Sequence, residues 1–235
     1  LYIISSVFRN NKGGLAPNTL DSELLPPERE TFIIGNLIEN NNNIDAPATQ
    51  ATNLSLGNGV VIAGGNNNII KNNVIANHNL YGVIITATAD VNYWPAHGNR
   101  VESNLIINSK RADIAFSGIS NLGNCFENNY FNTSIPPGLQ TLNNCDSSFY
   151  PLSADLSGMW SSLARVIQTS DGNYDQGDWR TFEAPANQPN MPIMDELIDL
   201  GYDKTTLPVS KIWSSVRPAV EVFSQYKDVL EVIEL

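Results

Sequence analysis

Positive charge is scarce in this chain of 235 residues, where 13 lysines and arginines stand against 24 acidic residues and give a net charge of −11. Nucleic-acid binding needs a concentrated basic surface, so no nucleic-acid partner is expected. Long apolar runs are also missing, and none approaches the roughly 18 residues of a membrane-spanning helix. Zinc-ligand spacings, phosphate-binding glycine loops and nucleophile elbows are absent as well. The 42% of hydrophobic residues nevertheless suffice for a core.

Asparagine, by contrast, is abundant and unevenly distributed. Of the 31 asparagines, 28 precede Cys145. The first 145 residues carry 7 basic and 10 acidic side chains, a charge of −3, whereas the remaining 90 carry 6 and 14, a charge of −8. The chain therefore divides into two regions of different chemistry.

An internal repeat runs through the asparagine-rich region, and a period of this length is typical of solenoid proteins. Three copies share the pattern Asn-x-apolar-x-x-Asn-x-apolar, and two earlier copies keep the apolar positions while losing asparagines. The copies begin at Leu1, Thr31, Asn68, Asn99 and Asn124. A second apolar element follows each copy and begins at Gly14, Gly59, Gly82, Asp113 and Gly138.

Each copy is expected to form short strands separated by sharp bends, because Asn and Gly tolerate the left-handed conformations that such bends need. The two apolar positions lie five residues apart, so they cannot share one face of an uninterrupted strand. A bend at the asparagine must therefore turn the chain so that both apolar side chains face the same side. Asparagines stacked in successive copies can also exchange amide hydrogen bonds as a ladder.

These motifs resemble the coil repeat of right-handed parallel β-helix proteins, the pectate-lyase-like superfamily. The resemblance covers residues 1–149 and implies an all-β fold, a right-handed parallel β-helix solenoid with coils about 4.8 Å apart. Because the repeat is already under way at Leu1, we expect N-terminal coils to precede this sequence. Residues 150–235 are expected to form a mostly irregular, partly helical segment that caps and wraps the solenoid, since a solenoid exposes an apolar end.

The two cysteines each follow an asparagine and lie 20 residues apart, at the same phase of successive coils. Stacked neighbours have Cα atoms within disulfide range, so we predict a Cys125–Cys145 disulfide, with two buried thiols as the alternative. A disulfide indicates an oxidising compartment, and we therefore expect an extracellular, periplasmic or cell-surface protein.

In lyases and epimerases of the β-helix superfamily, acid–base groups and Ca²⁺ ligands project from one sheet into a groove. The corresponding outward positions of the second elements are Ala16, Val61, Ile84, Ala115 and Gln140. None of these residues is ionisable, so the face offers no general base and no carboxylate cluster. It forms an exposed apolar patch unless the insertions or the C-terminal tail cover it.

Candidate carbohydrate-binding residues lie in and near the inserted loop 90–97. Tyr93 and Trp94, with His78, combine aromatic rings and polar groups, which suits stacking on sugars. The structural alternative is that the two rings only pack the loop down.

Candidate catalytic residues are His97, Arg111 and Asp113, because a histidine titrates near neutral pH and can act beside a carboxylate. The alternative is that His97 is a solvated turn residue. Lys110-Arg111 next to Asp113 can equally be a surface ion pair of little energetic consequence.

Calcium is the one cofactor for which the sequence offers ligands. Asp171, Asn173 and Asp175 alternate like the oxygen ligands of a calcium loop. Glycine falls at the seventh rather than the sixth position, and Phe182 stands where such loops carry glutamate, which favours a plain acidic turn. The loop 18–23 with Glu28 and Glu30 offers ligands for calcium or sugar hydroxyls, or is an ordinary solvated excursion.

The leading functional hypothesis is a non-catalytic protein, either a polysaccharide-binding module or a structural subunit of a larger extracellular assembly. For a protein partner or self-association, the candidate surfaces are the open N-terminal coil end and an expected helix at about 219–235. The alternative is a polysaccharide lyase, epimerase or hydrolase acting on a cell-surface or plant-type polysaccharide, which rests on fold-level analogy alone.

Overall fold

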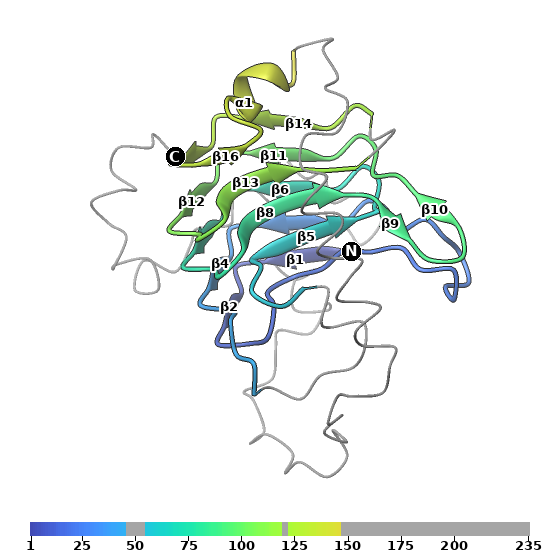
Figure 1. The fold of residues 1–235 in the computed structure, drawn as a ribbon, viewed down its shortest axis with the longest axis horizontal. Coiled ribbons are helices and arrows are strands. Elements are labelled where there is room, and N and C mark those ends of the chain that lie inside the picture. Colours follow the sequence, from blue (N-terminus) through green and yellow to red (C-terminus); the bar gives the residue numbers. More distant parts are fainter. Residues whose placement is uncertain (46–54, 119–121, 147–235) are drawn as a thin grey trace, which may run out of the picture.

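Short parallel strands arranged in three sheets dominate the computed structural model, which describes residues 1–45, 55–118 and 122–146 (Figure 1). Sheet A contains β1 (Tyr2–Ile4), β3 (Phe32–Ile34), β6 (Ile69–Lys71), β11 (Arg100–Glu102) and β14 (Cys125–Glu127). Sheet B contains β2 (Val7–Arg9), β4 (Leu37–Glu39), β7 (Val74–Ala76), β12 (Leu105–Ile107) and β15 (Tyr130–Phe131). Sheet C contains β5 (Val60–Ala63), β8 (Tyr81–Thr86), β13 (Ala112–Phe116) and β16 (Ser134–Ile135).

The chain visits the sheets in the fixed order A, B, C and then starts again one layer further along the stack. Leu15 supplies the sheet C position of the first layer through a parallel bridge to Val60. This arrangement of strands stacked in register is compatible with a parallel β-helix or another solenoid. Ile70, Val101 and Phe126 are direct neighbours across sheet A, so the predicted column of apolar residues is confirmed.

The core lies between the three sheets and is built from the inward residue of each short strand. Its fully buried members include Ile33 and Ile70 from sheet A, Ile38 and Ile75 from sheet B, and Val83 from sheet C. A strand of three residues buries only its central side chain on this side, which explains why the apolar positions of one copy are so far apart.

Each tight bend between sheets A and B uses two successive residues with different tasks. The first residue has a positive φ, which is 54° for Asn72, 51° for Ser103 and 53° for Asn128. The second residue is the buried ladder asparagine, such as Asn73 or Asn104. The residue before the ladder asparagine therefore makes the bend, and the expectation that the ladder asparagine itself does so is wrong.

The side chains of the ladder asparagines form hydrogen bonds with backbone N–H and carbonyl groups at the bends. The Oδ1 atom of Asn104 accepts both the backbone and the side-chain N–H of Asn73, each at 2.9 Å. The side chain of Asn104 in turn donates to the carbonyl of Ile70 at 2.9 Å. Because Asn104 is fully buried, no water can replace these partners.

A short helix, α1 (Leu139–Leu142), closes this ladder at one end of the stack, beyond β14 (Figure 1). Gln140 in α1 accepts the backbone and side-chain N–H groups of Asn129 at 2.9 Å. The sequence predicted a strand beginning at Gly138 in this region, and that prediction is wrong. Sheet C instead takes Ser134 and Ile135, which pair with β13.

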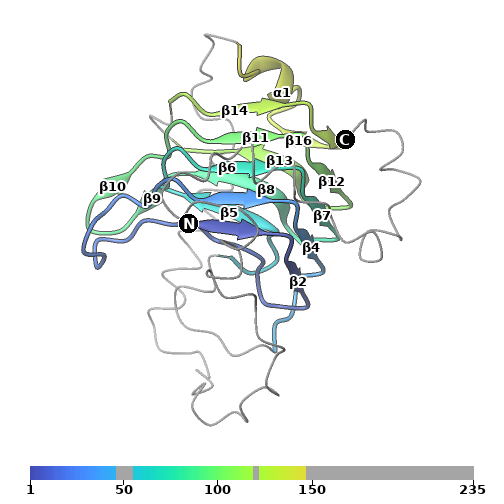
Figure 2. The same cartoon turned by 180° about the vertical axis from the view of Figure 1, so that it is seen from behind.

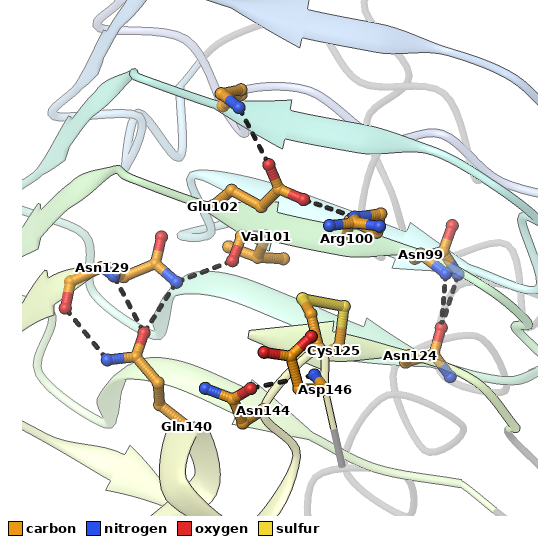
Figure 3. The surroundings of a disulfide bond; sticks show 12 residues. Asn99, Arg100, Val101, Glu102, Asn124, Cys125, Asn129, Gln140, Asn144 and Asp146 are labelled. Atoms are coloured by element: carbon orange, nitrogen blue, oxygen red, sulfur yellow. Dashed lines mark hydrogen bonds and ion pairs between the residues drawn. A yellow bond between two sulfur atoms is a disulfide. The ribbon is translucent and has the colours of Figure 1, made fainter. Parts of the chain in front are cut away.

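A disulfide joins Cys125 at the start of β14 to Cys145, with the Cα atoms 4.8 Å apart (Figure 3). The pairing is the one that the coil phase predicts. Among the described residues, no helix is long and apolar enough to cross a membrane.

Candidate functional site

Two segments meet at one edge of the stack and project beyond the sheets, as both views show (Figures 1 and 2). The first segment comprises residues 16–30. The second comprises residues 88–97 and contains the antiparallel strands β9 (Thr88–Ala89) and β10 (Tyr93–Trp94). We call these two segments together the lip.

Thr19 anchors the first segment of the lip to sheet C. This fully buried residue donates its backbone N–H to Ala63 at 2.9 Å and its hydroxyl to the Gly64 carbonyl at 2.7 Å. Its hydroxyl oxygen also accepts the N–H of Glu28 at 3.0 Å, so both ends of the segment are tied to one point.

Trp94 anchors the second segment by packing against Gly64, where the chain leaves β5. Gly64 has a φ of 71°, and a Cβ placed there would lie 2.9 Å from the Cβ of Trp94 and 3.0 Å from its carbonyl oxygen. Only glycine combines this φ with such a close approach of the hairpin. Glycine at this position therefore sets how closely the hairpin lies against sheet C.

Asp21 joins the two segments by bonding Asn92, which lies 71 residues further along the chain. Its carboxylate accepts the backbone N–H of Asn92 at 2.8 Å and a hydrogen bond from the Asn92 side chain. The backbone N–H of Asp21 donates to a carboxylate oxygen of Asp90 at 3.0 Å. The bonds from Asn92 hold the pKa of Asp21 below its ordinary value, so this carboxyl stays ionised at neutral pH.

Tyr93 and Trp94 occupy different environments on the hairpin. Tyr93 is 43% exposed, whereas the indole N–H of Trp94 and the hydroxyl of Thr88, opposite it in the hairpin, are buried without a hydrogen-bond partner. The Trp94 indole also contributes to the low pKa of Asp21, although its N–H falls short of hydrogen-bond geometry. A buried polar group left unpaired costs about 1–3 kcal/mol, so these two groups destabilise the hairpin slightly.

The lip therefore brings together an exposed tyrosine and carboxylate hydrogen-bond acceptors on a braced support. Apolar side chains are exposed at both tips, where Leu24 is 98% and Val91 is 87% exposed. This combination can bind a partly apolar, hydroxyl-bearing ligand.

His97 is the last residue of the lip, and it holds the corner of the chain that follows. Its Nδ1 accepts the backbone N–H of Leu122 at 3.0 Å, so the neutral ring carries its proton on Nε2. Its backbone N–H donates to the Asn66 side chain, and its carbonyl accepts from Asn67, both at 2.8 Å. These three bonds tie together the corners that follow β5, β8 and β13.

Asp113 lies near the other end of sheet C, at the start of β13, and is 1% exposed. Its carboxylate accepts the N–H groups of Ser109, Asn132 and Thr133 at 2.9–3.1 Å and the Thr133 hydroxyl at 3.2 Å. These bonds hold two corners of the chain and leave the carboxylate no surface for a substrate. Its role in the structure is that of a corner anchor.

Arg111 precedes β13, with its guanidinium 5.4 Å from the centre of the Tyr81 ring. It is near Asp113 in sequence, whereas His97 lies past the opposite ends of the strands of sheet C. The structure therefore does not bring the three candidate catalytic residues together.

His78 is 1% exposed and belongs to the interior of the third bend of the coil. Its Nε2 lies 3.2 Å from the Ile38 carbonyl, which matches the bond from the Asn41 side chain to the Phe8 carbonyl one coil earlier. Burial lowers the pKa of His78 to about 4, so the ring is neutral. It replaces a ladder asparagine and is not available to a carbohydrate.

The outward row of sheet C, where the resemblance would place a catalytic groove, is not an open face. Val61, Ile84 and Ala115 are 5%, 4% and 0% exposed and belong to a second apolar cluster. Ala16 continues this row and is exposed, whereas Gln140 belongs to α1 and not to the row. These three residues of the row are therefore covered, which is the alternative that the sequence left open to an exposed apolar patch.

Charged side chains cross the outer face of sheet A (Figure 3). Glu102 pairs with Lys71 at 3.0 Å and with Arg100. Burial raises the pKa of Glu102, but hydrogen bonds from the two cations more than offset this effect and leave the pKa below its ordinary value. Oxygens of Glu102 and Glu127 lie within 4.8 Å of the Cys145 sulfur, which cannot act as a thiolate ligand because it is in the disulfide.

The remaining predicted features lie outside the described residues. These are the calcium candidates Asp171, Asn173 and Asp175, the capping and wrapping segment 150–235, and the C-terminal helix. Comparison of the chain with protein-family models, curated proteins and solved structures finds no match. Its function must therefore be argued from its own residues.

Proposed function

We propose that this chain is a non-catalytic carbohydrate-binding protein that uses the lip, with Tyr93 as the residue that stacks on a sugar ring. The observation that carries the proposal is that Tyr93 is 43% exposed on a hairpin braced by Asp21, close to the carboxylates of Asp21 and Asp90. Aromatic rings bind the apolar faces of sugars, and ionised carboxylates are strong acceptors for their hydroxyls.

We further propose that the stacked strands form a right-handed parallel β-helix of the pectate-lyase-like superfamily and that the protein works outside the cytoplasm. The fixed order of sheets and the asparagine ladders support the first statement. The disulfide supports the second, because such bonds persist in oxidising compartments.

A non-catalytic role fits the state of the ionisable candidates. Asp113 is saturated with hydrogen bonds, His78 is buried and neutral, and His97 uses Nδ1 to hold a corner. None of the three combines exposure with a neighbouring acid or base, as general acid–base catalysis requires.

The test is affinity electrophoresis of the full chain against a panel of soluble polysaccharides. Tyr93→Ala should weaken binding about fivefold or more, because one lost stacking contact is of order 1 kcal/mol or above. Tyr130→Ala is the matched control, since Tyr130 is 42% exposed but lies in β15, away from the lip. Equal loss in both variants, or no binding to any glycan, would overturn the proposal.

The same panel separates binding from cleavage. Incubation with each polysaccharide, once with Ca²⁺ and once with a chelator, should release neither new reducing ends nor unsaturated products. Release of new reducing ends alone would instead establish a hydrolase, and release of unsaturated products would establish a lyase.

A structural role in an assembly is the second candidate, and the outer edge of the first coil favours it. β1 and β2 are the end strands of sheets A and B, and Tyr2 and Val7 are 45% and 43% exposed there. Apolar side chains exposed on these strands can pack against another chain. Sedimentation of Val7→Lys against the unmodified chain tests this role, because a self-associating edge should lose its oligomer.

A further inference from the structure

The lip is strongly acidic. Its two segments carry five acidic residues, Asp21, Glu23, Glu28, Glu30 and Asp90, against the single cation Arg29. His97, also in the second segment, is counted without charge in this sum. The net charge of the two segments is therefore −4.

Two of these carboxylates lie next to the aromatic hairpin. Asp21 is bonded to Asn92, the residue before Tyr93, and Asp90 accepts the N–H of Asp21. An ionised carboxylate accepts up to about four hydrogen bonds, so both retain room for further donors. A sugar hydroxyl can donate to them, whereas a uronate carboxylate cannot donate and is repelled.

Glu28 belongs to the support rather than to the binding surface. Its oxygens accept the Thr31 hydroxyl at 2.6 Å and the Asn68 side chain at 2.9 Å, at the end of an asparagine ladder. Its charge still adds to the negative field at the lip, because the Debye length at physiological salt is about 8 Å.

We propose that the lip selects uncharged, hydroxyl-rich glycan chains and discriminates against polyuronates. This inference rests on the carbohydrate-binding function proposed above, and it adds the chemical class of the ligand. Repulsion between several like charges at about one Debye length amounts to roughly a tenfold difference in affinity.

The experiment compares the full chain on a neutral galactomannan and on polygalacturonate, each at low and at high salt. The neutral chain should bind at least about tenfold more tightly, and the difference should shrink at high salt because added ions screen the repulsion. Asp90→Asn keeps an acceptor for the Asp21 N–H while removing one charge, so it should reduce the difference in affinity between the two polysaccharides. Glu127→Gln removes a charge from sheet A instead and should leave that difference in affinity unchanged.

The outcomes separate this inference from the function beneath it. If polygalacturonate binds as well as or better than the neutral chain, and Tyr93→Ala abolishes that binding, the lip binds carbohydrate but the charge inference is wrong. If Tyr93→Ala changes binding to neither polysaccharide, the proposed function itself fails. An equal effect of Asp90→Asn and Glu127→Gln would also overturn the inference, because overall charge would then explain the preference.

Discussion

Replacing Asn104 with alanine tests the energetic role of the ladder most sharply. The substitution removes the acceptor of two Asn73 N–H groups and the donor to the Ile70 carbonyl, in a site that is fully buried. A buried polar group without a partner costs about 1–3 kcal/mol, and at least two backbone groups, the Asn73 N–H and the Ile70 carbonyl, lose their partner. We expect the free energy of unfolding to fall by about 4 kcal/mol, a large part of the 5–15 kcal/mol typical of proteins.

Urea unfolding followed by circular dichroism measures this loss, with Asn79→Ala as the matched control. Asn79 is exposed and uses its backbone N–H, not its side chain, to bond Asn42, so its variant should change stability by less than about 0.5 kcal/mol. If Asn104→Ala proved as stable as Asn79→Ala, the ladder would not stabilise the stack and the reasoning from buried amides would be refuted.

Three further predictions concern the bends and the disulfide. Gly59→Ala should lower the free energy of unfolding, measured by thermal unfolding, by about 3 kcal/mol or more, because the new Cβ would lie 2.5 Å from the Gly82 carbonyl oxygen. Gly138→Ala is the control: its Cβ would have no atom within 4 Å, so the variant should lose only about 1 kcal/mol, the cost of a φ of 75°. The pKa of His78 is about 4 in the folded chain and near 6.5 when unfolded, so acid favours the unfolded state. The free energy of unfolding should therefore fall by about 3 kcal/mol between pH 7 and pH 4. His78→Asn should remove this part of the pH dependence, and an unchanged pH dependence in the variant would contradict the prediction. Cys125→Ala with Cys145→Ala should cost about 3 kcal/mol in urea unfolding, as expected for a loop of 20 residues, and no loss would show that the disulfide is energetically neutral.

The repeat and its register could be predicted because each rung requires the same residue types at the same phase. The column through Ile70, Val101 and Phe126 and the pairing of the cysteines follow from that phase alone. Gly138 misled the prediction because a glycine before an apolar residue can begin a strand or precede a helix. Here the segment is helical, and α1 places Gln140 at the end of the asparagine ladder. No local sequence pattern indicates this contact.

The lip could be predicted only in part. Tyr93 and Trp94 stand out as aromatic residues in an inserted loop. The bond between Asp21 and Asn92, however, joins two residues 71 positions apart and leaves no periodic signal in the sequence. His78 was misassigned because one histidine among asparagines looks like a functional residue. In three dimensions it occupies a ladder position and donates to a carbonyl as the asparagines do.

The central claim, that the lip binds carbohydrate through Tyr93, is tested most directly by fluorine NMR of the chain with its 8 tyrosines replaced by fluorotyrosine. Tyr93→Phe and Tyr130→Phe assign the two resonances. Titration with a bound glycan should shift or broaden the Tyr93 signal and leave the Tyr130 signal in place. An unmoved Tyr93 resonance at saturating glycan would contradict the account.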